Sequence, residues 1–182
     1  MIFKLLPFEG AYLINIDKKD DSRGFFARLY CREEFKKQGL NINLVQMNTT
    51  LSRKKGTIRG LHFQRPPKAE SKIVRCVHGA IWDVIVDLRS NSTTFGNWYG
   101  KELTEDNRTM LYVPEGFAHG FQTLSDNVEM LYLHSEFYSS EHEGGLHYND
   151  SDVGIKWPIQ VTDLSKRDRL HPALNQLDPI TL

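Results

Sequence analysis

The chain has 182 residues, and its 23 lysines and arginines balance 23 aspartates and glutamates, so the formal net charge is zero. This balance does not favour a nucleic-acid or acidic-membrane partner held by bulk charge. Two cysteines are too few for a disulfide framework, and 40% hydrophobic residues is an ordinary value for a globular protein.

The length predicts a single domain over residues 1–182 with a sizeable core. The first residues, MIFKLLPFEGAYLINID, lack a basic region followed by an apolar core and a small-residue cleavage site. No apolar run approaches membrane-spanning length. We therefore expect a cytoplasmic protein with neither a membrane nor a nucleic-acid partner.

One short helix is predicted early in the chain, in CREEFKKQGL at residues 31–40. Glu33 and Glu34 lie near its start, Lys36 and Lys37 near its end, and Gly39 is suited to end it. Most later segments predict strands, with Gly, Pro, Asn and Asp between them: KIVRCVHG (72–79), AIWDVIVDLR (80–89), MLYVPEGFAHGFQTLSDN (110–127) and VEMLYLHSEFY (128–138). A helical turn is expected near Ser165. The pattern indicates an all-β sandwich or barrel with a few short helices.

The segment RGLHFQ, residues 59–64, is unusually rich in polar groups for a strand. Alternate residues of a strand share a face, so His62 and Gln64 point one way while Leu61 and Phe63 point the other. The polar face either meets solvent or lines the inside of a barrel. The segment alone does not choose between these interpretations.

A second histidine, His119, follows the turn in VPEGFAHGF. Cupin metal sites use His-x-His, then Glu, then a later His. Glu70 and His119 could supply the last two, but the first element here reads His62-Phe63-Gln64. Glutamine is a poor ligand for transition metals, so we expect no metal. A histidine without metal partners is free for acid–base work.

Other side chains could complete an acid–base site. Asp168 in LSKRD could hold one ring nitrogen of a histidine so that the other acts as a base. Tyr132 and Tyr138 are possible proton donors, although tyrosines in strands are usually packing residues.

The basic residues admit two interpretations each. Lys72 could stabilise a developing oxyanion or lie on the surface with its charge in water. Arg23 and Arg59 could bind phosphate through bidentate contacts or be ordinary surface arginines.

Several motifs in order carry a resemblance to a known family: DSRGFFARLY, VQMNTTLSRKKGTIRGLHFQ, KIVRCVHGAIWDVIVDLR, TFGNWYGKELTEDN, LYVPEGFAHGFQTLSD, LYLHSEFY, EHEGG and GIKWP. From about Asp21 to Asp168 the chain resembles the dTDP-4-dehydrorhamnose 3,5-epimerase family. The resemblance implies a metal-free cupin jelly roll, no cofactor, and usually a homodimer.

The resemblance also implies an isomerase reaction. The substrate would be a nucleotide-linked 4-keto-6-deoxyhexose, whose ketone acidifies the hydrogens at C3 and C5. By motif match His62 is the base and Asp168 its partner. Tyr132 is the acid that returns a proton to the opposite face, and Lys72 stabilises the enolate.

The matching binding positions surround this centre. His119 and Arg59 are implied to line the sugar and phosphate region, and Tyr138 and Glu143 to lie over the nucleotide and at the rim. The positions implied to hold the nucleotide and diphosphate are Arg23, Phe26, Gln46 and Asn48.

One departure from the family motif concerns recognition of the nucleobase. Many thymidine-linked members read RGFFFE where this chain reads RGFFAR, so Arg28 replaces a glutamate. An arginine donor suits the N3 acceptor of cytosine, whereas a glutamate acceptor suits the N3–H of thymine, so both dTDP and CDP are considered.

A 3,4-ketoisomerase of the same superfamily and a non-catalytic sugar-binding cupin are the alternative functions. Whether C3, C5 or both are inverted stays open.

Overall fold

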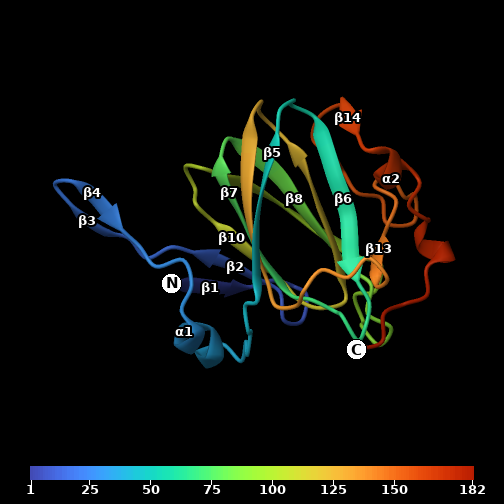
Figure 1. The fold of residues 1–182 in the computed structure, drawn as a ribbon, viewed down its shortest axis with the longest axis horizontal. Helices are drawn as coiled ribbons and strands as arrows, with labels where there is room; N and C mark the ends of the chain where they lie inside the picture. The colour runs from blue at the N-terminus through green and yellow to red at the C-terminus, as the bar shows by residue number, and fades with distance from the viewer.

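The structure is a computed structural model that describes residues 1–182, and two facing β-sheets form its body (Figure 1). The first sheet has the strand order β1-β2-β10-β7-β12-β5, and all its neighbours are antiparallel. Its strands are Ile2–Leu5 (β1), Tyr12–Asn15 (β2), Met110–Val113 (β10), Lys72–His78 (β7), Val128–His134 (β12) and Gln46–Ser52 (β5).

The second sheet has the order β13-β6-β11-β8-β9, and β14 adds to β6 in parallel. Its strands are Glu143–Gly145 (β13), Thr57–Gln64 (β6), Phe117–Thr123 (β11), Ala80–Asp87 (β8), Trp98–Thr104 (β9) and Asp163–Leu164 (β14). The two sheets form a cupin jelly-roll barrel, which confirms the predicted all-β class.

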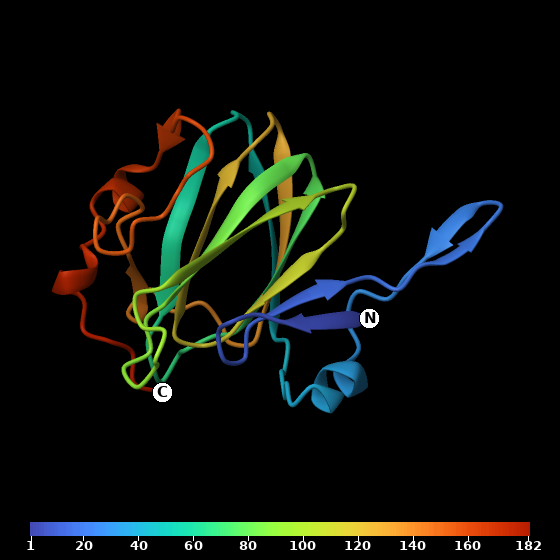
Figure 2. The same cartoon turned by 180° about the vertical axis from the view of Figure 1, so that it is seen from behind.

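The remaining elements lie outside the barrel wall. A hairpin of Lys19–Asp21 (β3) and Gly24–Phe26 (β4) projects away from the body, on the left in Figure 1 and on the right in Figure 2. The helical elements are Arg32–Lys37 (α1), Lys166–Arg169 (α2) and the 3₁₀ turn Leu174–Gln176 (η1). No helix is long and apolar enough to cross a membrane.

Helix α1 is the helix predicted from the charge pattern. Its first turn holds Glu33 and Glu34, and its last turn holds Lys36 and Lys37. Gly39 follows with a φ of +79°, a conformation that glycine adopts without a Cβ penalty.

Three apolar clusters hold the fold together. The largest, of 15 residues, joins the inner faces of both sheets, with Val74 and Met130 from the first sheet and Ile85 and Phe121 from the second. A third cluster packs the fully buried Phe35 of α1 against strands of the first sheet. Such contacts position the two sheets as opposite walls.

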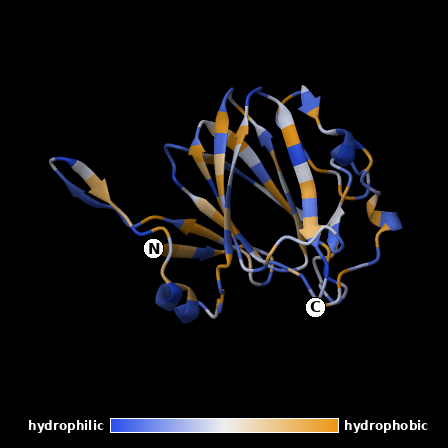
Figure 3. Cartoon of the chain, in the orientation of Figure 1, coloured by the Kyte–Doolittle hydropathy of each residue, from blue (hydrophilic) through white to orange (hydrophobic).

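The second cluster explains the alternation in β6. Leu61 and Phe63 point outward, where Leu146, Val153 and Ile155 of the C-terminal segment cover them. Burying each such side chain is worth about 1.5–3 kcal/mol, so the register of β6 is strongly specified. The alternating colour bands along β6 in Figure 3 show this pattern, and the polar face is turned into the barrel.

Candidate active site

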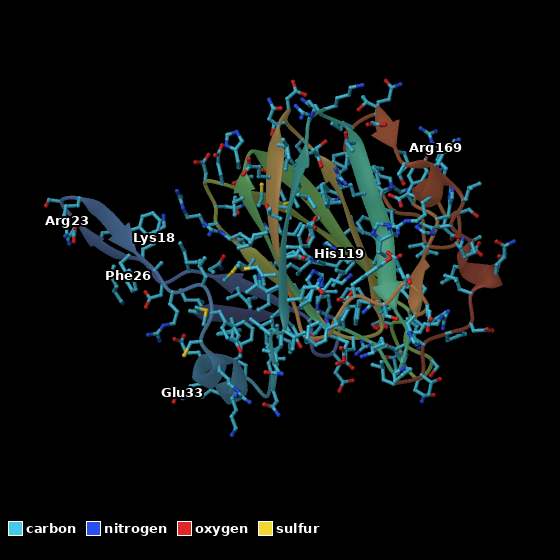
Figure 4. All side chains as sticks on the ribbon, in the orientation of Figure 1. Lys18, Arg23, Phe26, Glu33, His119 and Arg169 are labelled. Atoms are coloured by element: carbon cyan, nitrogen blue, oxygen red, sulfur yellow. The ribbon has the colours of Figure 1, made fainter.

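A cavity of about 620 Å³ lies inside the barrel. Both sheets and the C-terminal segment contribute to its wall, and His119 lies between the sheets in Figure 4. The polar face of β6 therefore lines the cavity instead of meeting solvent. The lining side chains with hydrogen-bonding or ionisable groups are Asn48, Thr50, Thr57, Arg59, His62, Gln64, Glu70, Lys72, His119, Tyr132, His134, Tyr138, Glu143, Asp163, Ser165, Arg167 and Asp168.

Gly60 brings β6 close to its neighbours. Its φ is +113°, and a Cβ there would lie 2.7 Å from the carbonyl oxygen of His119. The position therefore requires glycine. The Gly60 backbone N–H donates to Asp168 Oδ2 at 3.1 Å, which ties the strand that carries His62 to α2.

Helix α2 places the acidic partner. The Ser165 hydroxyl oxygen accepts a hydrogen bond from the Asp168 backbone N–H at 3.0 Å, so Ser165 is the N-cap of this short helix. The carboxylate of Asp168 then lies 2.9 Å from His62 Nε2. The predicted histidine–aspartate pair is thus present. Helix α2, near the C-terminus, supplies Asp168, and strand β6, in the first half of the chain, supplies His62.

The electrostatics of the pair favour a neutral histidine. Burial pushes the pKa of Asp168 up, but the nearby His171 ring and the hydrogen bonds from His62 and the Gly60 N–H hold it well below its usual range. The carboxylate can only accept, so Nε2 of His62 carries a proton and Nδ1 is left to act as a base. Burial lowers the pKa of His62, which keeps the ring neutral near pH 7.

Tyr132 lies on the opposite sheet, on β12, and lines the same cavity. Burial raises its pKa, so the phenol stays protonated and can donate. Its ring meets that of His119 edge-on, with centroids 6.3 Å apart. His119 Nε2 lies 2.8 Å from Asp83 Oδ1, a carboxyl group whose pKa burial raises.

Lys72 lines the cavity from β7. Its side chain is only 10% exposed, and its Nζ lies 3.0 Å from Glu70 Oε1. The interpretation of Lys72 as a surface lysine is therefore wrong. A buried ammonium at this position can stabilise negative charge that develops on a bound molecule.

Comparison with known proteins adds to this geometry. Residues 6–176 match the family described as dTDP-4-dehydrorhamnose 3,5-epimerase. A protein of that name from Sinorhizobium fredii is 43% identical over 178 residues, which cover 97% of this chain and 91% of the relative. The chain belongs to this epimerase family.

Solved structures of dTDP-4-dehydrorhamnose 3,5-epimerases share the fold of the chain. The Elizabethkingia anophelis enzyme superimposes with a TM-score of 0.94 at 41% identity and covers 97% of both chains. The Bacillus anthracis enzyme, solved with TDP and PPi bound, has a TM-score of 0.91 at 42% identity and covers 94% of this chain and 98% of that one.

Most of the residues that family resemblance singled out meet in the cavity. They are His62, Tyr132, Asp168, Lys72, Asn48, Arg59, His119, Tyr138 and Glu143. At the rim, the Tyr138 hydroxyl donates to Glu143 Oε2 at 3.0 Å, and the Tyr138 N–H donates to Gln46 Oε1 at 3.3 Å. Gln46 thus touches the rim through Tyr138 without lining the cavity.

Three other predicted site residues, Arg23, Phe26 and Arg28, lie away from both the cavity of their own chain and its rim. Arg23 and Phe26 are on the projecting hairpin, as Figure 4 shows, where Arg23 pairs with Asp21 at 2.6 Å and Phe26 is 73% exposed. Arg28 Nη1 lies 2.8 Å from Glu34 Oε1 of α1. Within one chain these three residues do not join the other site residues.

Sequence reasoning missed several neighbours of the pair. Arg167 Nη2 lies 3.2 Å from His62 Nε2, and His171 Nε2 lies 3.4 Å from Asp168 Oδ1. Arg167 directly precedes Asp168 and His171 follows it by three residues, so the assignment of Asp168 to the site was a sequence signal for both. Asp83, the partner of His119, had a signal of its own, because it is the single acid within the apolar run AIWDVIV.

The residues that a cupin metal pattern would use have other partners here. Glu70 bonds His134, and His119 bonds Asp83. A different group, His62, Asp168 and His171, offers ligand atoms within 4.8 Å of one another. Arg167 places a fixed positive charge beside His62 in that group, which opposes a cation.

Proposed function

We propose that this chain is an epimerase that inverts C3, C5 or both of a thymidine diphosphate-linked 4-keto-6-deoxyhexose. The observation that carries the proposal is that the His62–Asp168 pair and Tyr132 face one cavity from opposite sheets. The nucleotide follows from family membership and from the relative that was solved with TDP bound.

The proposed reaction begins at a carbon next to the ketone. Nδ1 of His62 takes the proton, and the electrons of the broken C–H bond move onto the ketone oxygen to form an enolate. Asp168 stabilises the imidazolium, and Lys72 stabilises the enolate oxygen. The substrate's ketone accepts the electron pair, so the proposed chemistry needs no cofactor.

Inversion requires that the proton return to the other face of the sugar. Tyr132 comes from the wall opposite His62 and is protonated, so it can donate to that face. A 3,4-ketoisomerase moves the carbonyl along the sugar and has no need of an acid on the far wall. A non-catalytic sugar-binding cupin would need neither the pair nor the tyrosine.

We further propose a homodimer in which the β3–β4 hairpin of each protomer completes the cavity of its partner. The proposal reconciles the family-matched roles of Arg23 and Phe26 with their position far from their own cavity (Figure 4). An apolar ring that is 73% exposed, as Phe26 is, suits a contact with a base or a second chain.

Thymidine is the nucleoside that the structure favours over cytidine. Arg28 was the reason to consider CDP, but its guanidinium is engaged by Glu34 at 2.8 Å.

The proposed cytoplasmic location rests on the two cysteines being free. The proposed single domain over residues 1–182 rests on a cavity walled by both sheets and by α2.

Proton exchange in D₂O tests the proposed activity. A thymidine diphosphate-linked 4-keto-6-deoxyhexose is incubated with the protein, and deuterium uptake at C3 and C5 is followed by NMR. Uptake at one or both centres is expected, and its position tells which centre is acidified. Absence of uptake at both carbons would reject the epimerase.

A further inference from the structure

Two buried ionisable residues in the cavity, Glu70 and His134, have no part in the proposed reaction. Their side chains are only 9% and 12% exposed. Glu70 Oε1 lies 3.0 Å from Lys72 Nζ, and Glu70 Oε2 lies 2.7 Å from His134 Nδ1. The other ring nitrogen of His134, Nε2, lies 3.3 Å from Asn48 Nδ2. The four side chains form one continuous row along the cavity wall.

Glu70 sets the direction of these bonds. Burial pushes its pKa up, but the hydrogen bond from His134 and the charge of Lys72 hold it below the ordinary value for glutamate. The group is therefore a carboxylate, which only accepts. Oε1 accepts a hydrogen bond from the ammonium of Lys72, and Oε2 accepts one from the Nδ1–H of His134. A single carboxylate thus fixes both nitrogens.

The tautomer of His134 then orients Asn48. With Nδ1–H on Glu70, the neutral ring leaves Nε2 as an acceptor, and only the amide nitrogen of Asn48 can donate to it. The amide oxygen of Asn48 is left to accept from a bound molecule. Protonation of His134 would put a donor at Nε2 and force the amide to turn round.

The charged and titratable neighbours of His134 are few. Glu70 precedes β7, Lys72 lies on β7 in register with His134, and Tyr132 stacks at 6.2 Å from the same strand. Strand β5 supplies the neutral Asn48. The acid beside the ring is Glu70 and the basic residue is Lys72. Because Glu70 is the acceptor at Nδ1, it selects the tautomer of His134 that carries its proton there.

We propose that Glu70 and His134 are positioning residues of the epimerase: Glu70 holds Lys72 at the enolate oxygen, and His134 turns the Asn48 amide so that its oxygen accepts from the nucleotide portion of the substrate. The proposal rests on the function proposed above. It separates two effects, because Glu70 acts on the chemical step through Lys72 and His134 acts on binding through Asn48.

Four variants test this division. Glu70→Gln has one acceptor oxygen in place of two and cannot serve both nitrogens. His134→Leu removes both ring contacts, whereas His134→Gln keeps an amide that can accept from Asn48. The matched control is His78→Leu, since His78 makes the same kind of pair with Glu105 at 2.9 Å on the surface, away from the cavity.

The expected kinetics differ between the two sites. Glu70→Gln lowers kcat about tenfold, the effect of one misplaced charged hydrogen bond, and changes the Kd for dTDP less than the His134 variant does. His134→Leu raises KM and the Kd for dTDP about tenfold with a smaller change in kcat, and His134→Gln recovers part of this loss. His78→Leu behaves as wild type. A similar fall in kcat together with a similar rise in KM in all three Glu70 and His134 variants would show a merely structural role and overturn the proposal.

Two further measurements do not depend on catalytic turnover. Calorimetry with dTDP measures how His134→Leu changes binding alone. ¹⁵N NMR of the His134 ring determines which nitrogen carries the proton. The proposal expects a protonated Nδ1 and an unprotonated Nε2 in the wild-type protein. A protonated Nε2 in the resting protein, or unchanged dTDP binding in His134→Leu, overturns it. If these measurements succeed while the wild type exchanges no deuterium, the proposed reaction fails and the orientation of Asn48 stands.

Discussion

Nε2 of His62 lies 2.9 Å from Oδ1 of Asp168, although the two residues are 106 positions apart in the chain. The strand β6 supplies the histidine, and the capped turn of α2 supplies the carboxylate. The contact fixes which ring nitrogen is protonated. It therefore decides which nitrogen can act on a substrate.

Replacing Asp168 by asparagine removes the negative charge while keeping the size of the side chain. The imidazolium that forms on His62 then loses its stabilising partner, and the tautomer is no longer enforced. We expect kcat to fall roughly 10²- to 10⁴-fold, the range seen when such an orienting carboxylate is lost. Steady-state kinetics measures this, with circular dichroism to show that the fold persists. A fall of less than threefold would mean that Asp168 does not support the base.

The pH dependence follows from the burial of His62. Because burial lowers its pKa below the ordinary value of 6.5, the active neutral form dominates at pH 7 and is lost only as the pH falls below that value. We expect kcat/KM to be flat near neutrality and to decline on the acid side. Asp168 raises the pKa of His62, so the acid limb of Asp168→Asn should move to still lower pH. A limb centred above 6.5 in the wild type would contradict the assignment.

Mixing two inactive variants tests the exchange of hairpins between protomers. His62→Ala damages the cavity, and Arg23→Ala combined with Phe26→Ala damages the hairpin. If each hairpin completes its partner's cavity, a heterodimer has one doubly damaged and one intact site. Random reassociation of equal amounts should then recover about one quarter of wild-type activity. Light scattering confirms the dimer, and a mixture that stays as inactive as its components would reject the exchange.

The nucleoside preference is open to calorimetry. Since Arg28 is paired with Glu34, we expect dTDP to bind more tightly than CDP. Glu34→Gln, which loosens that pair, should narrow the difference by freeing the guanidinium. Tighter binding of CDP by the wild-type protein would instead assign Arg28 to the base.

The sequence predicted the fold and the centre of the site for physical reasons that can be traced. The period-two alternation in RGLHFQ is enforced by burial of Leu61 and Phe63, so it correctly placed His62 on the opposite face. Family resemblance, not periodicity, indicated that this face is the inside of the barrel. Helix α1 followed from its charges and Gly39.

Other features could not be read from local patterns. The bonds of Glu70 to His134 and of His119 to Asp83 join residues 64 and 36 positions apart, and only the strand registers bring them together. Arg23 and Phe26 matched the family motif, yet a match in sequence does not reveal that they lie on a hairpin outside the cavity of their own chain. Partnerships across sheets and between chains depend on the three-dimensional arrangement.

His62 and Tyr132 are proposed to act as base and acid from opposite walls of the cavity, and Tyr132→Phe removes the acid alone. The variant keeps His62, so the proton can leave and return on one face. We predict that deuterium still enters the 4-keto sugar nucleotide from D₂O while the inverted sugar no longer forms, as seen by NMR. Tyr99→Phe, which changes a tyrosine packed on the same core cluster, is the control and should invert normally. Inversion by Tyr132→Phe at the wild-type rate would show that Tyr132 is not the acid.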